Sequence, residues 1–308
     1  MTTLRTHVDE YLALRRSLGY KLRRDGFLLA DFATYHEQTG QATVTAQMML
    51  AWAQQAADAT PNWRYRRLGV VRHFAIYLSG IDPTQEIPPS DLLPARAHRP
   101  TPYIYSHADV LNLIATARNL PNNWQRTTLP TIVGLLAVTG MRVGEALNLD
   151  RTDVDWSDGL LVLRGTKFGK SREVVLHPTV VQALRTYDCQ RRMIVPHPKA
   201  PAFFLSTTGL RIHYQTFCQL YLDLVRRVGL EAPFAGCLPQ AHGLRHTFAV
   251  NTLLSWHRAG IDVSERMHLL STYLGHGDPV HTYWYLSAVP ELMTLVAERL
   301  EHSQEESS

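Results

Sequence analysis

The 308-residue chain is long enough for two domains, since hydrophobic cores usually stop growing at roughly 100 to 200 residues each. Its composition, 45% hydrophobic and 19% charged, is that of a soluble globular protein, and no apolar run reaches the roughly 18 residues that a membrane span needs. The net charge is +4, but segment 291–308 holds five acidic residues and one arginine, which leaves +8 for the rest. Such a basic body fits a polyanionic partner.

The basic residues are 27 arginines and only four lysines. The planar guanidinium suits phosphate recognition, yet a GC-rich coding sequence produces the same bias, and both explanations stay open. Polar residues follow Met1 without an apolar leader, so we expect a cytoplasmic protein associated with the nucleoid. Three cysteines, without CxxC spacing, indicate neither a disulfide framework nor a zinc site.

Six of the 17 prolines lie within 83–102, a stretch that neither a helix nor a central strand tolerates. We therefore predict a linker at 83–102, which separates an N-terminal helical domain, 1–82, from a larger domain, 103–308. The smaller domain is predicted to contain four helices, three of them followed by glycine, as helix ends often are. Their predicted bounds are 3–18, 22–39, 45–57 and 62–78.

The helix predicted at 62–78 has two distinct faces. Its apolar residues recur at spacings of three and four, the pattern of a buried helix face. Arginines lie largely off that face, at positions Arg64, Arg66, Arg67 and Arg72. We expect them to contact a DNA backbone, and a plain solvated surface is the alternative.

In the larger domain, helices are predicted at 106–118 and 129–147, and again from 178 to about 300 with loops at 196–201 and 231–240. Between them, two short β-prone runs, 160–163 and 173–176, flank a GTKFGKS turn and predict an antiparallel hairpin. The fold class is therefore mainly α with a small antiparallel β-sheet. The last helix, 291–300, carries a leucine-rich stripe that packs either on its own domain or on a neighbouring protomer.

The first chemical signal is His242 with Arg245 in AHGLRHTFAV. Residues three apart share a helix face, so an imidazole and a guanidinium can converge there on one phosphate. With 15 histidines and this arginine content, about one such HxxR is expected by chance. The motif therefore needs support from other residues.

Upstream, LLAVTGMRVGEALNLD places Arg142 after a glycine that can turn the chain, with Glu145 on the same helical face. A buried Glu145 would orient Arg142 or His242, and an ordinary surface ion pair is the alternative. Lys167 lies in the predicted β-turn, where its flexible stem can bring an ammonium to a leaving oxygen. A lysine in a turn is also often simply solvated.

Downstream, LGHGDPVHTYWYL offers His276 after a probable turn and Tyr285 nine residues later. Tyr283 is a rival for the same role. On a helix the two tyrosines point roughly 200° apart, so only one of them can face the site.

In this order, the residues resemble the tyrosine recombinase (phage integrase) family, over about 103–288. The family pattern is Arg, Lys in a β-hairpin, HxxR, a second His or Trp, and Tyr. The matching residues are Arg142, Lys167, His242, Arg245, His276 and Tyr285, with Glu145 at the family's acidic position. The interval from LGH to the nucleophile selects Tyr285, and the N-terminal helices look like the family's SAM-like core-binding domain.

The resemblance implies a site-specific recombinase that forms a 3′-phosphotyrosine on Tyr285. Arg142, Arg245 and His276 would then neutralise the phosphate, His242 would help deprotonate the tyrosine, and Lys167 would protonate the leaving 5′-oxygen. It implies neither a metal nor another cofactor, and no membrane. The expected partner is double-stranded DNA with a specific recombination site, also contacted by Lys170. The protein is expected to be a homotetramer on DNA and a monomer or dimer when free.

Three alternatives stay open. His242 and His246, four apart on a helix, have the spacing of a zinc pair, although HGLRH lacks the glutamate of HExxH. A non-catalytic DNA-binding regulator needs the arginines but no ordered set with Lys and Tyr. A type IB topoisomerase or a telomere resolvase uses similar chemistry. Among recombinases, the TYWYLS context favours a mobile-element or Xer-like enzyme.

Overall fold

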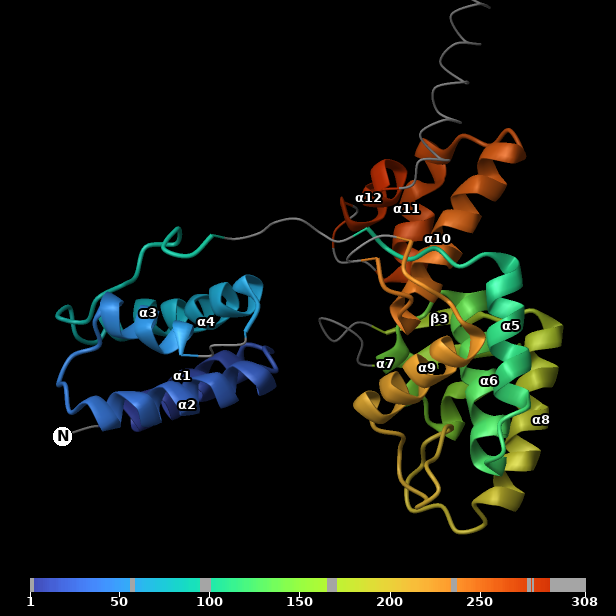
Figure 1. Cartoon of the computed structure of the whole chain (residues 1–308), viewed down its shortest axis with the longest axis horizontal. Helices are drawn as coiled ribbons and strands as arrows, with labels where there is room; N and C mark the ends of the chain where they lie inside the picture. The colour runs from blue at the N-terminus through green and yellow to red at the C-terminus, as the bar shows by residue number, and fades with distance from the viewer. Residues whose placement is uncertain are drawn as a thin grey trace, which may run out of the picture. The chain divides into compact units, whose positions relative to one another are not determined.

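The computed structural model describes residues 3–55, 59–94, 101–164, 171–233, 237–275, 278 and 280–288, except for the side chains of 281 and 286–288. The chain divides into two compact units, Met1–Arg99 and Pro100–Ser308 (Figure 1). The division falls inside the proline-rich segment 83–102. Within the described ranges, no helix is long and apolar enough to cross a membrane.

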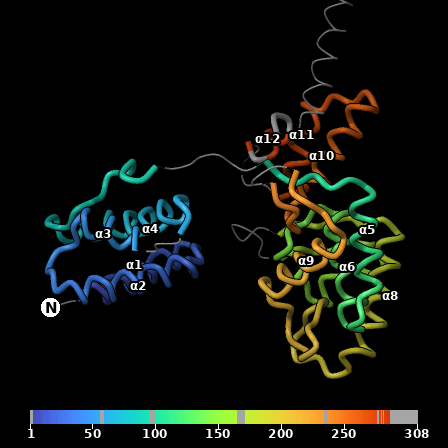
Figure 2. The backbone as a smooth tube through the Cα atoms, viewed as in Figure 1, coloured from blue at the N-terminus to red at the C-terminus, as the bar shows by residue number. Residues whose placement is uncertain are grey.

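The described part of the first unit contains four helices (Figure 2). Its core packs Phe32, Trp52 and Phe74, all fully buried. Threonine side chains cap the starts of three of the helices, as N-cap threonines commonly do. The helices are α1 (Leu4–Ser17), α2 (Arg23–Thr39), α3 (Ala46–Gln54) and α4 (Pro61–Ser79). Their positions agree with the prediction, with end points that differ by up to three residues.

The described beginning of the proline-rich segment, 83–94, packs on the first unit without forming a helix or strand. The Glu86 amide donates to the Val44 carbonyl at 3.0 Å. The Arg72 Nε donates to the Pro88 carbonyl at 2.9 Å. Arg72, predicted to face DNA, therefore anchors this segment to α4.

The second unit is mainly helical, with a three-stranded antiparallel sheet in the order β1-β2-β3 (Figure 1). This confirms the predicted fold class. The strands are β1 (Val154–Asp155), β2 (Leu160–Leu163) and β3 (Arg172–Val175). The helices are α5 (His107–Arg118), α6 (Asn123–Thr139), α7 (Val143–Asn148), α8 (Pro178–Ile194), α9 (Tyr214–Val228), α10 (Ala241–Arg258), α11 (Val263–Leu274) and α12 (Val280–Ala288).

Helix α6 forms the centre of this unit, because it packs against α5, α8 and α10. Ile132 and Val133 of α6 are fully buried in the main core, together with Leu244 of α10. A smaller apolar cluster joins α10, α11 and α12, and it contains Leu253, Leu274 and Tyr285. Helix α10 therefore runs from one cluster to the other, and the HxxR motif lies at its start.

The prediction of a single helix at 129–147 is wrong, because the structure has two helices there, α6 and α7. Helix α6 begins six residues earlier, where the Asn122 side chain caps it, and ends at Gly140 with φ +59°. A Cβ at Gly140 would lie 2.4 Å from the Phe248 ring, so glycine is required both by the backbone and by this close approach. Arg142 follows in an extended conformation and precedes α7. The break therefore takes Arg142 out of the helix and lets it turn toward α10 and α11.

The predicted hairpin is present, with Leu161 opposite Val174 and Leu163 opposite Arg172. Its second strand begins one residue earlier than predicted. The two-residue strand β1 was not predicted, because it is too short for an alternating pattern. The predicted turn with Lys167 and Lys170, and the predicted helix 291–300, lie outside the described residues.

Candidate active site

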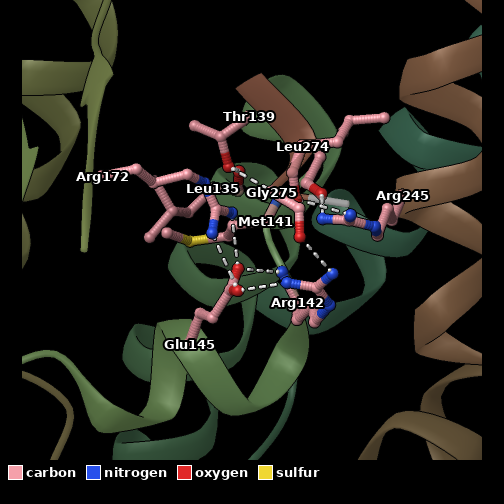
Figure 3. A network of polar contacts seen from close by, with 10 residues as sticks. Leu135, Thr139, Met141, Arg142, Glu145, Arg172, Arg245, Leu274 and Gly275 are labelled. Carbon is pink, nitrogen blue, oxygen red and sulfur yellow. Dashed lines mark hydrogen bonds and ion pairs between the residues drawn. The ribbon is translucent and has the colours of Figure 1, made fainter. Parts of the chain in front are cut away.

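Glu145 of α7 is the centre of a polar cluster that joins α7 to β3 (Figure 3). Arg142 donates to its carboxylate twice, from the backbone N–H at 2.9 Å and from Nη1 at 2.7 Å. Arg172 donates from Nη1 at 3.0 Å and from Nη2 at 2.7 Å. The Glu145 side chain is only 9% exposed. The pair is therefore not an ordinary surface ion pair, because the buried carboxylate bonds both the backbone and the guanidinium of Arg142.

The contacts with Arg142 and Arg172 determine the ionisation state of Glu145. Burial by itself would raise the pKa of the carboxyl, but the hydrogen bonds and positive charges of Arg172 and Arg142 outweigh burial and lower the pKa to about 2. The carboxylate is consequently charged at neutral pH and can hold both guanidiniums in fixed positions.

Arg142 and Arg245 both reach the C-terminal end of α11 (Figure 3). Arg142 Nη2 donates to the Gly275 carbonyl at 2.9 Å. Arg245 donates from Nη2 to the Leu274 carbonyl at 2.7 Å and from Nη1 to the Gly140 carbonyl at 2.8 Å. Arg142 and Arg245, which are distant in the chain, thus bond two adjacent carbonyls, those of the Leu and Gly in the LGH motif. His276, the next residue, lies outside the described ranges.

The cluster carries more positive than negative charge. It contains three guanidiniums, of Arg142, Arg172 and Arg245, and one carboxylate, that of Glu145. Arg245 is 2% exposed. Its burial and the charge of Arg142 lower its pKa to about 10, against the opposing charges of Tyr285 and Glu145. An anion placed between Arg142 and Arg245 would relieve this repulsion, so the site favours a phosphate group electrostatically.

Tyr285 faces inward from α12 and is 1% exposed, whereas Tyr283 is 49% exposed. The Tyr285 hydroxyl lies 3.0 Å from Nδ1 of His246. Its phenolate would lie close enough to Arg245 to raise the pKa of that guanidinium. Of the two rival tyrosines, Tyr285 is thus the one that shares a site with the HxxR arginine.

His242, predicted to help deprotonate Tyr285, is exposed, while His246 is buried. The two rings meet edge to face with centroids 4.7 Å apart. A ring nitrogen of His246, a residue predicted above only as a possible metal ligand, therefore lies at the tyrosine hydroxyl. In the described ranges, no group of three or more His, Cys, Asp or Glu side chains could hold a metal ion.

Arg172 is the other member of the site that the sequence analysis did not name. It stands in RGTKFGKSREV, two residues after Lys170. The sequence feature that could have indicated Arg172 is its position directly after the predicted turn that carries Lys167. The turn itself, with Lys167 and Lys170, lies outside the described residues.

The arginines of α4 do not form one uniform surface. Arg67 is 11% exposed, pairs with Asp31 at 3.3 Å and stacks over the Trp52 ring at 3.9 Å. Arg66 is 53% exposed and makes a longer ion pair of 3.5 Å to α2. Arg64 is partly buried. Arg67 therefore supports the fold of the first unit, and contact of these arginines with DNA stays a prediction.

Comparison with known proteins identifies the class to which this fold and site belong. The family model described as "Phage integrase family" matches residues 105–291. The integrase/recombinase y4rB of Sinorhizobium fredii is 40% identical over 312 residues, which cover 99% of each protein. The tyrosine recombinase XerC of Mycobacterium sp. strain KMS is 29% identical over 287 residues, 90% of this chain and 91% of XerC. The chain belongs to the phage integrase family of tyrosine recombinases, which confirms the family prediction.

Solved structures show the same fold. XerA recombinase has a TM-score of 0.51 and 24% identity, over 98% of this chain and 97% of its own. The Tn1549 transposon integrase, solved with transposon right end DNA, has a TM-score of 0.65 and 15% identity, over 97% and 100%. A lambda integrase dimer bound to a core site has a TM-score of 0.57 and 17% identity, over 92% and 77%.

Proposed function

We propose that this chain is a site-specific recombinase that cleaves and rejoins DNA strands through a 3′-phosphotyrosine on Tyr285. The observation that carries the proposal is the meeting of Arg142, Arg245 and Tyr285 at one positively charged, largely buried site. Arginines that bind phosphate and a tyrosine that attacks it are the groups that this reaction requires.

The two arginines stabilise the charge that develops on phosphorus. Arg142 and Arg245 donate to the nonbridging oxygens, with His276 as a further donor. A guanidinium has five N–H groups, so each arginine can hold a backbone carbonyl of α11 and still donate to the phosphate. Their positions are set before DNA binds, so little reorganisation is needed when the transition state forms.

The proton steps balance the bond changes. The Tyr285 oxygen attacks phosphorus and loses its proton, and the bond from phosphorus to the 5′-oxygen breaks. Lys167 gives the proton that the 5′-oxygen needs to leave. His242 was predicted to accept the tyrosine proton, and His246 lies at hydrogen-bond distance for the same role. The phosphotyrosine ester conserves the bond energy, so a 5′-hydroxyl of another strand reverses the step without metal or nucleotide.

The proposed partner is double-stranded DNA with a specific recombination site. The basic body of the chain supports a polyanionic partner. Among the structural neighbours, one lambda integrase structure is a tetramer bound to a Holliday junction. We propose the same number of protomers on DNA here, with a monomer or dimer in its absence. The similarity to the Sinorhizobium integrase/recombinase favours integration, excision or transposition of a mobile element.

Two other functions have less support. The relatives are named integrases and recombinases, which favours strand exchange over a type IB topoisomerase or a telomere resolvase. A non-catalytic DNA-binding regulator would not need Tyr285 next to the phosphate-binding arginines.

The proposal is tested by trapping the covalent intermediate. Wild type, Tyr285→Phe and Tyr283→Phe are incubated with nicked DNA fragments from the neighbourhood of the gene, and adducts are separated on denaturing gels. We expect adducts with wild type and with Tyr283→Phe, and none with Tyr285→Phe, which should still bind the DNA. An adduct that survives in Tyr285→Phe and is lost in Tyr283→Phe would refute the assignment.

A further inference from the structure

Arg172, the first residue of β3, is a buried cation that the proposed chemistry does not use. Its side chain is 13% exposed. Its two terminal nitrogens donate to the two oxygens of Glu145, Nη1 to Oε1 and Nη2 to Oε2. Two parallel bonds of this kind fix the plane of a carboxylate as well as its distance. Glu145 in turn holds both the backbone and the guanidinium of Arg142.

Arg172 also covers Gly275, the second group that holds Arg142. A Cβ on Gly275 would lie 2.7 Å from Nη1 and 3.1 Å from Cζ of Arg172. Contacts under 3.0 Å are essentially never made by real Cβ atoms. The φ of +66° at Gly275 independently favours glycine. One side chain is thus packed against both partners of the Arg142 guanidinium, the Glu145 carboxylate and the Gly275 peptide.

We propose that Arg172 is a positioning residue for Arg142, and that through it β3 holds the phosphate-binding arginines in register with the end of α11. Both of its terminal nitrogens donate to Glu145, and we therefore assign Arg172 a role that acts through this carboxylate rather than through a contact with the phosphate. The inference that the position of Arg142 matters for strand cleavage rests on the proposed function. The positioning itself is a property of the protein without DNA.

The fork of the guanidinium, more than its charge, is the feature that this role requires. A lysine at 172 would keep the positive charge near Glu145 but could not make two parallel bonds. Arg172→Lys should therefore keep part of the function that Arg172→Gln loses, but less than wild type.

Arg164 offers a matched control on the same hairpin. It directly follows Leu163, whose strand partner is Arg172, and it donates to Asp153 at 2.7 Å. Its side chain is 65% exposed, and its ion-pair partner is Asp153 rather than Glu145. Arg164→Gln thus removes an ion-paired arginine from the hairpin without touching Glu145.

The first experiment reads the position of Arg142 directly, in the protein without DNA. Side-chain ¹⁵N NMR would follow the Arg142 Nε–H, assigned by its loss in Arg142→Lys. We expect an ordered signal in wild type and Arg164→Gln, and a mobile or exchange-broadened one in Arg172→Gln, with Arg172→Lys between them. An Arg142 signal that is equally ordered in Arg172→Gln would overturn the proposal.

The second experiment measures adduct formation in a single turnover as a function of DNA concentration. We expect Arg172→Gln to lose about 100-fold in the rate at saturating DNA, the size of effect that a 1 Å misplacement produces, with DNA affinity changed by less than about threefold. Arg172→Lys should recover part of the rate, and Arg164→Gln should match wild type. A loss that appears only in DNA affinity, or a wild-type rate in Arg172→Gln, would overturn the proposal.

A double-mutant cycle covers the case in which Arg172→Gln folds poorly. Gly275→Ala should displace the Arg172 guanidinium, so its effect on the Arg142 signal should be smaller when residue 172 is already lysine. Additive effects would contradict the contact. If Arg142 is loosened as expected while wild type forms no adduct with any DNA, the proposed function fails and the positioning role stands.

Discussion

Two clusters in the second unit each gather several arginines around one buried carboxylate, yet only one of them is suited to catalysis. Glu145 holds Arg142 and Arg172. Asp188, on α8 and only 6% exposed, pairs with Arg151, Arg191 and Arg192. In both, burial would raise the pKa of the carboxyl, and the arginines outweigh it and lower the pKa. A count of arginines per carboxylate therefore does not identify the site.

The two clusters differ in where their cations can act. At Asp188, Arg151 and Arg192 are 48% and 61% exposed, so water screens their charges. The third, Arg191, is 4% exposed, and its Nη1 donates to the Ala202 and Phe203 carbonyls. This cluster joins α8 to the loop that follows it. At Glu145 the cations are less exposed, 26% for Arg142 and 13% for Arg172, and the buried Arg245 and Tyr285 lie beside them.

The largest effects should come from the buried arginine of each cluster. Arg245→Gln leaves the carbonyls of Gly140 and Leu274 without their donors, and Arg191→Gln does the same to two carbonyls in its own cluster. Both should destabilise folding, by about 1 to 3 kcal/mol for each buried group left without its partner. Only Arg245→Gln should also abolish cleavage, by at least about 10³-fold in the folded protein.

Urea unfolding and single-turnover adduct formation, measured on the same preparations, separate the two effects. Arg191→Gln should lower stability while the folded fraction keeps the wild-type rate. If Arg191→Gln reduced the rate as strongly as Arg245→Gln, the two clusters would not differ in function.

The acid dependence of stability is the second point of difference. The ordinary pKa of Glu145 is 4.5 and its folded value is about 2. The unfolded chain therefore binds a proton first as the pH falls, and stability that is present above pH 4.5 is lost progressively toward pH 2. The contribution is at most about 3 kcal/mol at neutral pH, from 1.36 kcal/mol per pKa unit.

Glu145→Gln should remove this part of the slope, so that urea midpoints measured from pH 6 to pH 3 fall less steeply than in wild type. Asp188→Asn should flatten the slope less, because two of the arginines around Asp188 are exposed to solvent. Parallel curves for wild type and Glu145→Gln would show that the Glu145 carboxylate is not held as the structure indicates.

The order of site residues was predictable from the sequence, because Arg142, Arg245 and Tyr285 occupy fixed places in a family pattern. The helices and the hairpin were also predictable, since their periodicity and glycine stops are local signals. The break at Gly140 was not, because the helical pattern continues through it and the close Phe248 ring comes from a distant helix.

The contacts of the site were predictable only in part. Glu145 was expected either to orient Arg142 or His242 or to form a surface ion pair, and in the structure its carboxylate is buried and bonded to Arg142. The carboxylate is also bound by Arg172, which is 27 residues away in the chain. The closeness of His246 to Tyr285 joins α10 to α12, and no local pattern carries such information.

Chemical reactivity provides a smaller but direct test of the tyrosines. In the protein without DNA, tetranitromethane should nitrate Tyr283, which is 49% exposed, well before Tyr285, which is 1% exposed. Peptide mass spectrometry over time gives both rates from one tryptic fragment. Equal nitration of the two residues at early times, in protein that remains folded, would contradict the inward orientation of Tyr285.

The smallest effect is expected at α4 in the first unit. If Arg66 contacts a DNA phosphate, Arg66→Gln should weaken binding to all sequences alike and reduce the slope of log K against log salt by about 0.9, the value for one phosphate contact. Arg67→Gln is the matched variant one residue away. Because Arg67 stacks on Trp52 and pairs with Asp31, its loss should lower the stability of the first unit instead. An unchanged slope in Arg66→Gln would place this arginine with the structural ones, and a reduced slope in Arg67→Gln without loss of stability would make Arg67 a DNA contact.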